Sequence, residues 1–155
     1  CPCGWLGAQV AGRACRCTPD QVARYQGKLS GPLLDRIDLQ VDVAAVPPDE
    51  LLAQPQGEAS AVVAERVAQA QARQTARQGA PNAALDAGQL EVHCPLDEAA
   101  SRFLQQAAAR LGWSGRGLHR VIKVARTVAD LAGAERITVA HLAEAMQYRR
   151  ALPGA

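Results

Sequence analysis

Only one stretch of this sequence, residues 37–43, alternates apolar and polar side chains as a β-strand does. The period of two runs from Ile37 to Val43 and places the apolar side chains on one face. A single strand cannot form a sheet, so its pairing partners must come from outside this sequence. We therefore expect the chain to be a piece of a longer protein whose remaining residues are mostly helical.

The composition favours helix in the rest of the chain. Hydrophobic residues make up 48% of the sequence but aromatic residues only 3%, so Ala, Val and Leu must build most of the core. Ala and the long unbranched side chains lose little conformational freedom in a helix. The formal net charge of +2 does not by itself indicate a nucleic-acid partner.

The sequence shows no sign of a membrane or of secretion. It contains no run of about 18 apolar residues that would span a bilayer. It also has no basic segment followed by an apolar one at its start, as a secretory leader would have. We expect a cytoplasmic protein without membrane contact.

Capping and stop signals predict where the helices lie. Thr18 and Gln21 form a capping box around Pro19, which predicts a helix to about Gln26. A long helix is predicted over 60–78, with Gly79 ending it. Further helices are predicted at about 97–111, at about 117–131 and after Thr138, whereas 83–92 is a short segment of uncertain structure. The expected organisation is a core end in 1–47 and a four-helix bundle in 48–155, with a hinge at 44–58.

The helix predicted at 117–131 has two faces. Its apolar stripe includes Val121, Ala125 and Ala129 and should be buried. Arg116, Arg120 and Lys123 lie at spacings of four and seven residues, which places them together on the other face. From the residues alone this is a solvated basic face, and Arg126 should belong to it.

Four cysteines occur in the first 17 residues, as two Cys-x-Cys pairs separated by 11 residues. Without a secretory signal, reduced thiols or a metal site are expected rather than disulfides. Four thiolates could hold zinc in tetrahedral geometry. The alternative is a set of reduced cysteines in a glycine-rich loop. The zinc hypothesis names Cys1, Cys3, Cys15 and Cys17.

Arg36 stands between two acids, Asp35 and Asp38, just before the predicted strand. From the residues alone it is a surface arginine paired with a neighbouring carboxylate, which contributes little stability. Its segment, SGPLLDRIDL, resembles the magnesium-chelatase-like AAA+ ATPases, and within them the ComM/YifB group of competence-related proteins. The resemblance implies that Arg36 is an arginine finger that stabilises the phosphoryl group of ATP bound to a neighbouring subunit.

The pattern from Ser114 to Leu131 is similar to the sensor-2 helix of the same family. The resemblance implies that Arg116 contacts nucleotide phosphates at the start of this helix, in its own subunit or in a neighbour. The family also carries the two cysteine pairs. In the family, an Asn that serves as the sensor-1 residue precedes these cysteines. Its position falls just before Cys1, so the present sequence does not include it.

The resemblance implies the end of an αβα AAA+ core followed by a helical lid, within a hexameric ring that uses ATP and Mg²⁺. It further implies work on DNA as a branch-migrating helicase in natural transformation. The sequence lacks the phosphate loop Gly-x-x-x-x-Gly-Lys-Ser/Thr, so we expect this chain alone to be monomeric and inactive on ATP. Two alternatives stay open: a chelatase motor subunit acting on a tetrapyrrole, and a non-catalytic zinc and helical-bundle module that binds protein or DNA.

Overall fold

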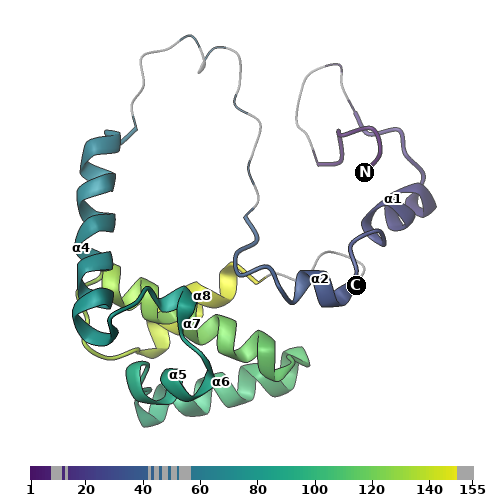
Figure 1. Ribbon diagram of the computed structural model, residues 1–155. Coiled ribbons are helices and arrows are strands. Elements are labelled where there is room, and N and C mark those ends of the chain that lie inside the picture. Colours follow the sequence, from purple (N-terminus) through teal and green to yellow (C-terminus); the bar gives the residue numbers. More distant parts are fainter. Residues whose placement is uncertain are drawn as a thin grey trace. The chain divides into compact units, whose positions relative to one another are not determined.

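A computed structural model describes residues 1–7, 12, 14–41, 43, 46, 49, 52 and 57–149. Contacts between residues divide the chain into two units, Cys1–Gly57 and Glu58–Arg150. The described residues form seven α-helices and one 3-10 helix (Figure 1). The predicted mostly helical fold is therefore confirmed. None of the described helices is both long and apolar enough to cross a membrane.

The described residues of the first unit form two short helices, α1 (Pro19–Gln26) and α2 (Gly31–Leu34). The predicted capping box starts α1: the Thr18 N–H donates to Gln21 Oε1 at 3.0 Å, and the Gln21 N–H donates to Thr18 Oγ1 at 3.3 Å. Ser30 caps α2 by accepting a hydrogen bond from the Leu33 N–H at 3.4 Å. No described residue of this unit is buried, so local hydrogen bonds and its loop contacts must hold it in shape.

The prediction of a strand at 37–43 is wrong. Residues 37–41 and 43 are described and form no strand, while Asp42 lies outside the described residues. A strand exists only when its backbone N–H and C=O groups pair with a neighbouring strand, and the described residues contain no strand beside this segment. Val41 and Val43 are 65% and 87% exposed, as expected for an apolar face without a sheet to cover it. The predicted hinge at 44–58 lies largely outside the described residues.

The second unit is a helical bundle. The uncertain segment at 83–92 falls on a 3-10 helix, η1 (Asn82–Ala84), and a short α-helix, α5 (Ala87–His93), which begins with a capping box between Asp86 and Gln89. The long helix has the predicted bounds, and Gly79 ends it with a φ of 73°. Asp97 and Thr138 cap their helices as predicted, while α7 begins slightly early, after the N-cap Ser114. The elements are α4 (Ser60–Gln78), η1 (Asn82–Ala84), α5 (Ala87–His93), α6 (Glu98–Leu111), α7 (Gly115–Leu131) and α8 (Val139–Gln147).

Helix α7 lies at the centre of this bundle and packs against α8, α4, η1 and α5. Of the stripe that the sequence predicts, Val121, Ala125 and Ala129 are fully buried, Leu118, Ile122 and Val128 are half-buried, and Ala132 is exposed. Trp113, in the turn before α7, is partly buried and packs against the same core. The buried apolar cluster comprises Leu85, Leu90, Cys94, Ala100, Leu104, Val121, Ala125, Ala129, Ile137, Leu142 and Ala145.

The prediction for Arg126 is wrong. This side chain is 1% exposed rather than solvated, and it pairs with Asp130, which is equally buried. Its remaining donors reach the backbone carbonyls of Ala134 and Glu135 at 2.5 and 2.8 Å. Burial is tolerated because the guanidinium has both an opposite charge and hydrogen-bond acceptors around it.

Candidate metal centre and basic hollow

A tight turn over residues 1–7 carries the first cysteine pair, Cys1 and Cys3. The Gly4 N–H donates to the Cys1 carbonyl at 3.1 Å, and the Leu6 N–H donates to Cys1 Sγ at 3.2 Å. Gly4 and Gly7 have φ values of 79° and 76°, in the left-handed region that glycine adopts without steric cost. The turn thus folds the chain around the first cysteine pair, with backbone N–H groups directed at sulfur.

The Sγ atoms of Cys1, Cys3, Cys15 and Cys17 all lie within 4.8 Å of one another. The separations are 3.4 Å for Cys1 and Cys3, 3.6 Å for Cys3 and Cys15, and 3.7 Å for Cys15 and Cys1. These exceed the roughly 2 Å of a disulfide bond. Tetrahedral zinc with Zn–S bonds of about 2.3 Å separates its sulfurs by about 3.8 Å, so the cluster fits this ion.

The environment favours a thiolate at Cys3. The pKa of this thiol is lowered to about 7, mainly because the backbone N–H of Trp5 donates to its sulfur. Partial desolvation opposes the change, and the thiols of Cys17 and Cys15 and the backbone of Arg16 reinforce it. A metal ion needs deprotonated sulfur, so Cys3 is suited to be a ligand at neutral pH.

The thiol of Cys15 behaves differently. The backbone of Cys17 acts to lower its pKa, but desolvation and the neighbouring thiols Cys3 and Cys17 outweigh that effect, and the pKa is raised. Sulfurs packed this closely cannot all ionise easily without a cation between them. The fifth cysteine, Cys94, is buried in the core of the helical unit and takes no part in the cluster.

Arg36 lies just after α2 on the surface of the first unit. Its Nη1 donates to the Pro32 carbonyl at 2.7 Å, so the guanidinium folds back over the short helix. This bond uses one of the five N–H donors of the side chain. The exposed position leaves Arg36 within reach of another molecule.

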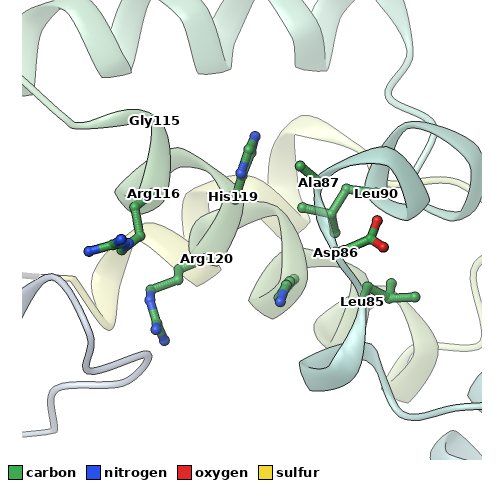
Figure 2. A pocket seen from close by; sticks show the side chains of 9 residues that line it. Leu85, Asp86, Ala87, Leu90, Gly115, Arg116, His119 and Arg120 are labelled. Carbon is green, nitrogen blue, oxygen red and sulfur yellow. The ribbon is translucent and has the colours of Figure 1, made fainter.

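Arg116 lies at the exposed start of α7, in the second unit. Ser114 caps this helix, since its Oγ accepts a hydrogen bond from the Gly117 N–H at 3.1 Å. Next to Arg116 is an open hollow between α7 and the segment 85–90 (Figure 2). The hollow is lined by Leu85, Asp86, Ala87, Leu90, Gly115, Arg116, His119, Arg120 and Lys123.

The charged side chains that line this hollow are mostly basic: Arg116, Arg120 and Lys123 against Asp86. Figure 2 shows the side chains of Arg116 and Arg120 on the same side of α7, with Asp86 across the hollow. Asp86 accepts the N–H of Gln89 at 2.8 Å, and Lys123 Nζ donates to the Ala83 carbonyl at 3.1 Å. The predicted basic face is thus confirmed for Arg116, Arg120 and Lys123, and the structure adds that it borders a concave surface.

A second arginine reaches the start of α7 from the end of α8. A Cβ built on Gly117 would lie 3.3 Å from Nη2 of Arg149. The guanidinium of Arg149 therefore lies against Gly117 in the first turn of α7. Gly117 directly follows Arg116 in the sequence. A glycine in the first turn of a basic helix is the signal that would have indicated this close approach.

The comparison with known families is decisive for both units. Residues 57–149 match the family described as magnesium chelatase, subunit ChlI C-terminal, and residues 1–51 match magnesium chelatase, subunit ChlI. The chain belongs to the magnesium chelatase ChlI family. The family assignment made from the motifs around Arg36 and Arg116 is confirmed.

Curated relatives of this ChlI-family chain include the competence protein ComM of Haemophilus influenzae, 43% identical over 135 residues. That alignment covers 86% of this chain and 26% of ComM. The uncharacterized proteins YifB of Salmonella typhimurium and of Escherichia coli are each 43% identical over 136 residues, which cover 86% of this chain and 27% of YifB. The chain thus spans about a quarter of the length of these relatives.

Proposed function

We propose that this chain forms the end of the nucleotide-binding core and the lid of an ATP-driven AAA+ ring motor of the ComM group. The intact protein would assemble as a hexamer and remodel DNA as a branch-migrating helicase. Family membership supports the use of ATP and Mg²⁺. The similarity to a protein named for competence supports DNA as the substrate.

The observation that carries the proposal is the position of Arg116. Its guanidinium lies at the N-terminus of a helix of 17 residues, where the backbone contributes a partial positive charge. Arg120 and Lys123 line the same hollow, so this surface suits a phosphate group. The buried face of α7 holds the helix rigidly, which is what a phosphate-sensing side chain requires.

Arg36 would complete the ATP site of a neighbouring subunit. Its planar, permanently charged guanidinium matches phosphate oxygens in charge and geometry. The bond from Nη1 of Arg36 to the Pro32 carbonyl positions the guanidinium and leaves further N–H donors for a ligand. An arginine supplied across a subunit boundary makes hydrolysis depend on assembly of the ring.

Zinc would have a structural role in the first unit. Bound Zn²⁺ cross-links four sulfurs and so stabilises the fold that presents them. No described residue of this unit is buried, which is the situation in which small units depend on a metal or a disulfide. The cysteine cluster would therefore keep the loop next to α1 in one shape.

The test is ATP hydrolysis by the intact protein, with and without DNA. Arg36→Ala should lower kcat roughly a thousandfold or more, the usual range for an arginine finger. Arg116→Ala should also lower turnover. Arg102→Ala is the control, because Arg102 forms an exposed pair with Glu98 on α6 and lies outside the hollow.

Three outcomes separate the alternatives. ATPase activity that DNA stimulates, and that needs Arg36, supports the proposal. ATPase activity indifferent to DNA would favour a chelatase motor subunit. No ATPase activity, or activity unchanged by Arg36→Ala, would contradict the motor role and leave a non-catalytic zinc and helical-bundle module.

A further inference from the structure

A second hollow lies beside the cysteine cluster, in the first unit. It is lined by Cys3, Trp5, Gly12, Ala14 and Arg16. An aromatic ring and an arginine side chain therefore border one concave surface, and neither has a part in the proposed ATP chemistry. Both side chains are accessible, since Trp5 is half-buried and Arg16 is exposed.

Both residues lie next to Cys3, which lines the same hollow. The backbones of Trp5 and Arg16 both act to lower the pKa of the Cys3 thiol. The two residues are 11 positions apart in sequence, but both border one hollow together with Cys3. A metal on the four sulfurs would fix this arrangement further, because it would hold both ends of the loop.

Among the described residues that line this hollow, the charged side chain is the basic one of Arg16. The described part of residues 1–36 carries four basic side chains and two acidic ones. Two of the basic side chains are Arg24, in the last turn of α1, and Lys28, which follows the helix and has its Nζ 5.5 Å from the centroid of the Tyr25 ring. An accessible ring within a basic surface suits a ligand that has both flat rings and negative charge.

We propose that Trp5 and Arg16 form a contact site for single-stranded nucleic acid, with Trp5 stacking on a base and Arg16 binding a phosphate. A single strand is favoured over a duplex because its bases can leave the stack and meet the ring. Arginine supplies paired N–H donors to phosphate oxygens. This inference rests on the proposed function in DNA remodelling. It names the residues at which this chain contacts the single strand.

The experiment uses the whole chain loaded with Zn²⁺. Trp113→Phe leaves Trp5 as the one tryptophan, because the sequence has two. Titration with an oligothymidylate of about 12 nucleotides, within the usual range of site sizes, should quench Trp5 fluorescence to saturation. Thymidine monophosphate and inorganic phosphate at the same phosphate concentration should quench little. Equal quenching by either would reduce the site to an anion site and contradict the proposal.

Variants then separate stacking from charge. Trp5→Ala should weaken oligothymidylate binding roughly five- to a hundredfold, measured by anisotropy of a labelled strand, while Trp5→Phe should lose less. Arg16→Ala should reduce the slope of log affinity against log salt by about 0.7, the contribution of one phosphate contact on a single strand. Zinc content of each variant shows that the cluster remains intact.

Two controls test the location of the site. Arg102→Ala removes the same charge from α6, and Tyr25→Ala removes an exposed ring from α1; both should bind within about twofold of the unchanged chain. If Trp5→Ala and Arg16→Ala bound the single strand as tightly as the unchanged chain does, the inference would be overturned. Tighter binding of the unchanged chain to a duplex of the same length would also overturn it. Arg36→Ala should bind the strand normally, so failure here is distinguishable from failure of the ATPase proposal.

Discussion

Arg126 and Asp130 form an ion pair inside the helical unit: Nε of Arg126 donates to Oδ1 of Asp130 at 3.1 Å, and each residue is 1% exposed. Arg77 of α4 donates to both oxygens of the same carboxylate, at 2.6 and 3.0 Å. Asn82 of η1 adds a bond of 2.8 Å. One carboxylate therefore links α4, η1 and α7, and these links hold the helix that carries Arg116.

Removal of this carboxylate should strongly destabilise the bundle. Asp130→Ala leaves the charge of Arg126 buried without its partner, which costs about 3–5 kcal/mol. Chemical unfolding in urea, followed by the helical circular-dichroism signal, measures the loss. Glu98→Ala is the control, since its pair with Arg102 is 84% and 62% exposed and should contribute less than about 1 kcal/mol. Equal losses in both variants would refute the role of the buried pair.

Stability should also fall in acid because of Asp130. Burial acts to raise the pKa of this carboxyl, but hydrogen bonds from Arg77 and Asn82 and the charge of Arg126 outweigh it, so the pKa is lowered. The unfolded chain has an Asp pKa of about 3.9. The stabilisation is therefore complete above about pH 4 and is lost as the pH falls from there through the folded pKa.

Thermal unfolding between pH 7 and pH 2 measures this effect. Asp130→Asn should have a lower Tm at pH 7 and a shallower decline of Tm below pH 4 than the unchanged chain. Parallel curves for the two proteins would show that the acid sensitivity has another source.

The chain should bind one Zn²⁺. Cys3→Ser and Cys15→Ser each remove one sulfur of the cluster and should abolish stoichiometric binding, measured as metal content after gel filtration. Substitution with Co²⁺ should give the absorption of tetrahedral cobalt–thiolate coordination. Cys94→Ala should retain the metal, because Cys94 belongs to the core of the other unit. Retention by Cys3→Ser would exclude a four-thiolate site.

Gly112 should be needed for its backbone conformation alone. It caps α6 with a φ of 61°, and a Cβ at this position would meet no atom within 4 Å. Gly112→Ala should therefore cost about 1–2 kcal/mol of unfolding free energy through backbone strain. Gly115→Ala, also without an atom within 4 Å but at the first residue of α7 and without a positive φ, should be neutral or slightly stabilising. Similar effects at both positions would contradict this explanation.

The sequence predicted those parts of the fold that depend on neighbouring residues. The bounds of α1 and α4 follow from a capping box and from a glycine stop, which act within one helical turn. The capping box between Asp86 and Gln89 would have indicated α5 in the same way. The strand failed because pairing depends on segments that the described residues do not contain.

Prediction of the site residues from the sequence was limited in the same way. The spacing of the cysteines predicted their convergence, because both pairs lie in one short loop. Burial of Arg126 could not be predicted from helical periodicity, since the carbonyls of Ala134 and Glu135 come from the connection after α7. The spacing of Arg126 and Asp130, four residues apart next to the buried Ala125 and Ala129, was the available signal.

Subunit mixing tests the central claim most directly, that Arg36 acts on the ATP of an adjoining subunit. Intact protein with Arg36→Ala should be inactive alone, and so should a variant whose phosphate-loop lysine is replaced. Mixed rings should regain ATPase activity, because an intact ATP site can then adjoin an intact Arg36. Mixed rings that stay inactive, or full activity of the Arg36→Ala protein alone, would contradict the account.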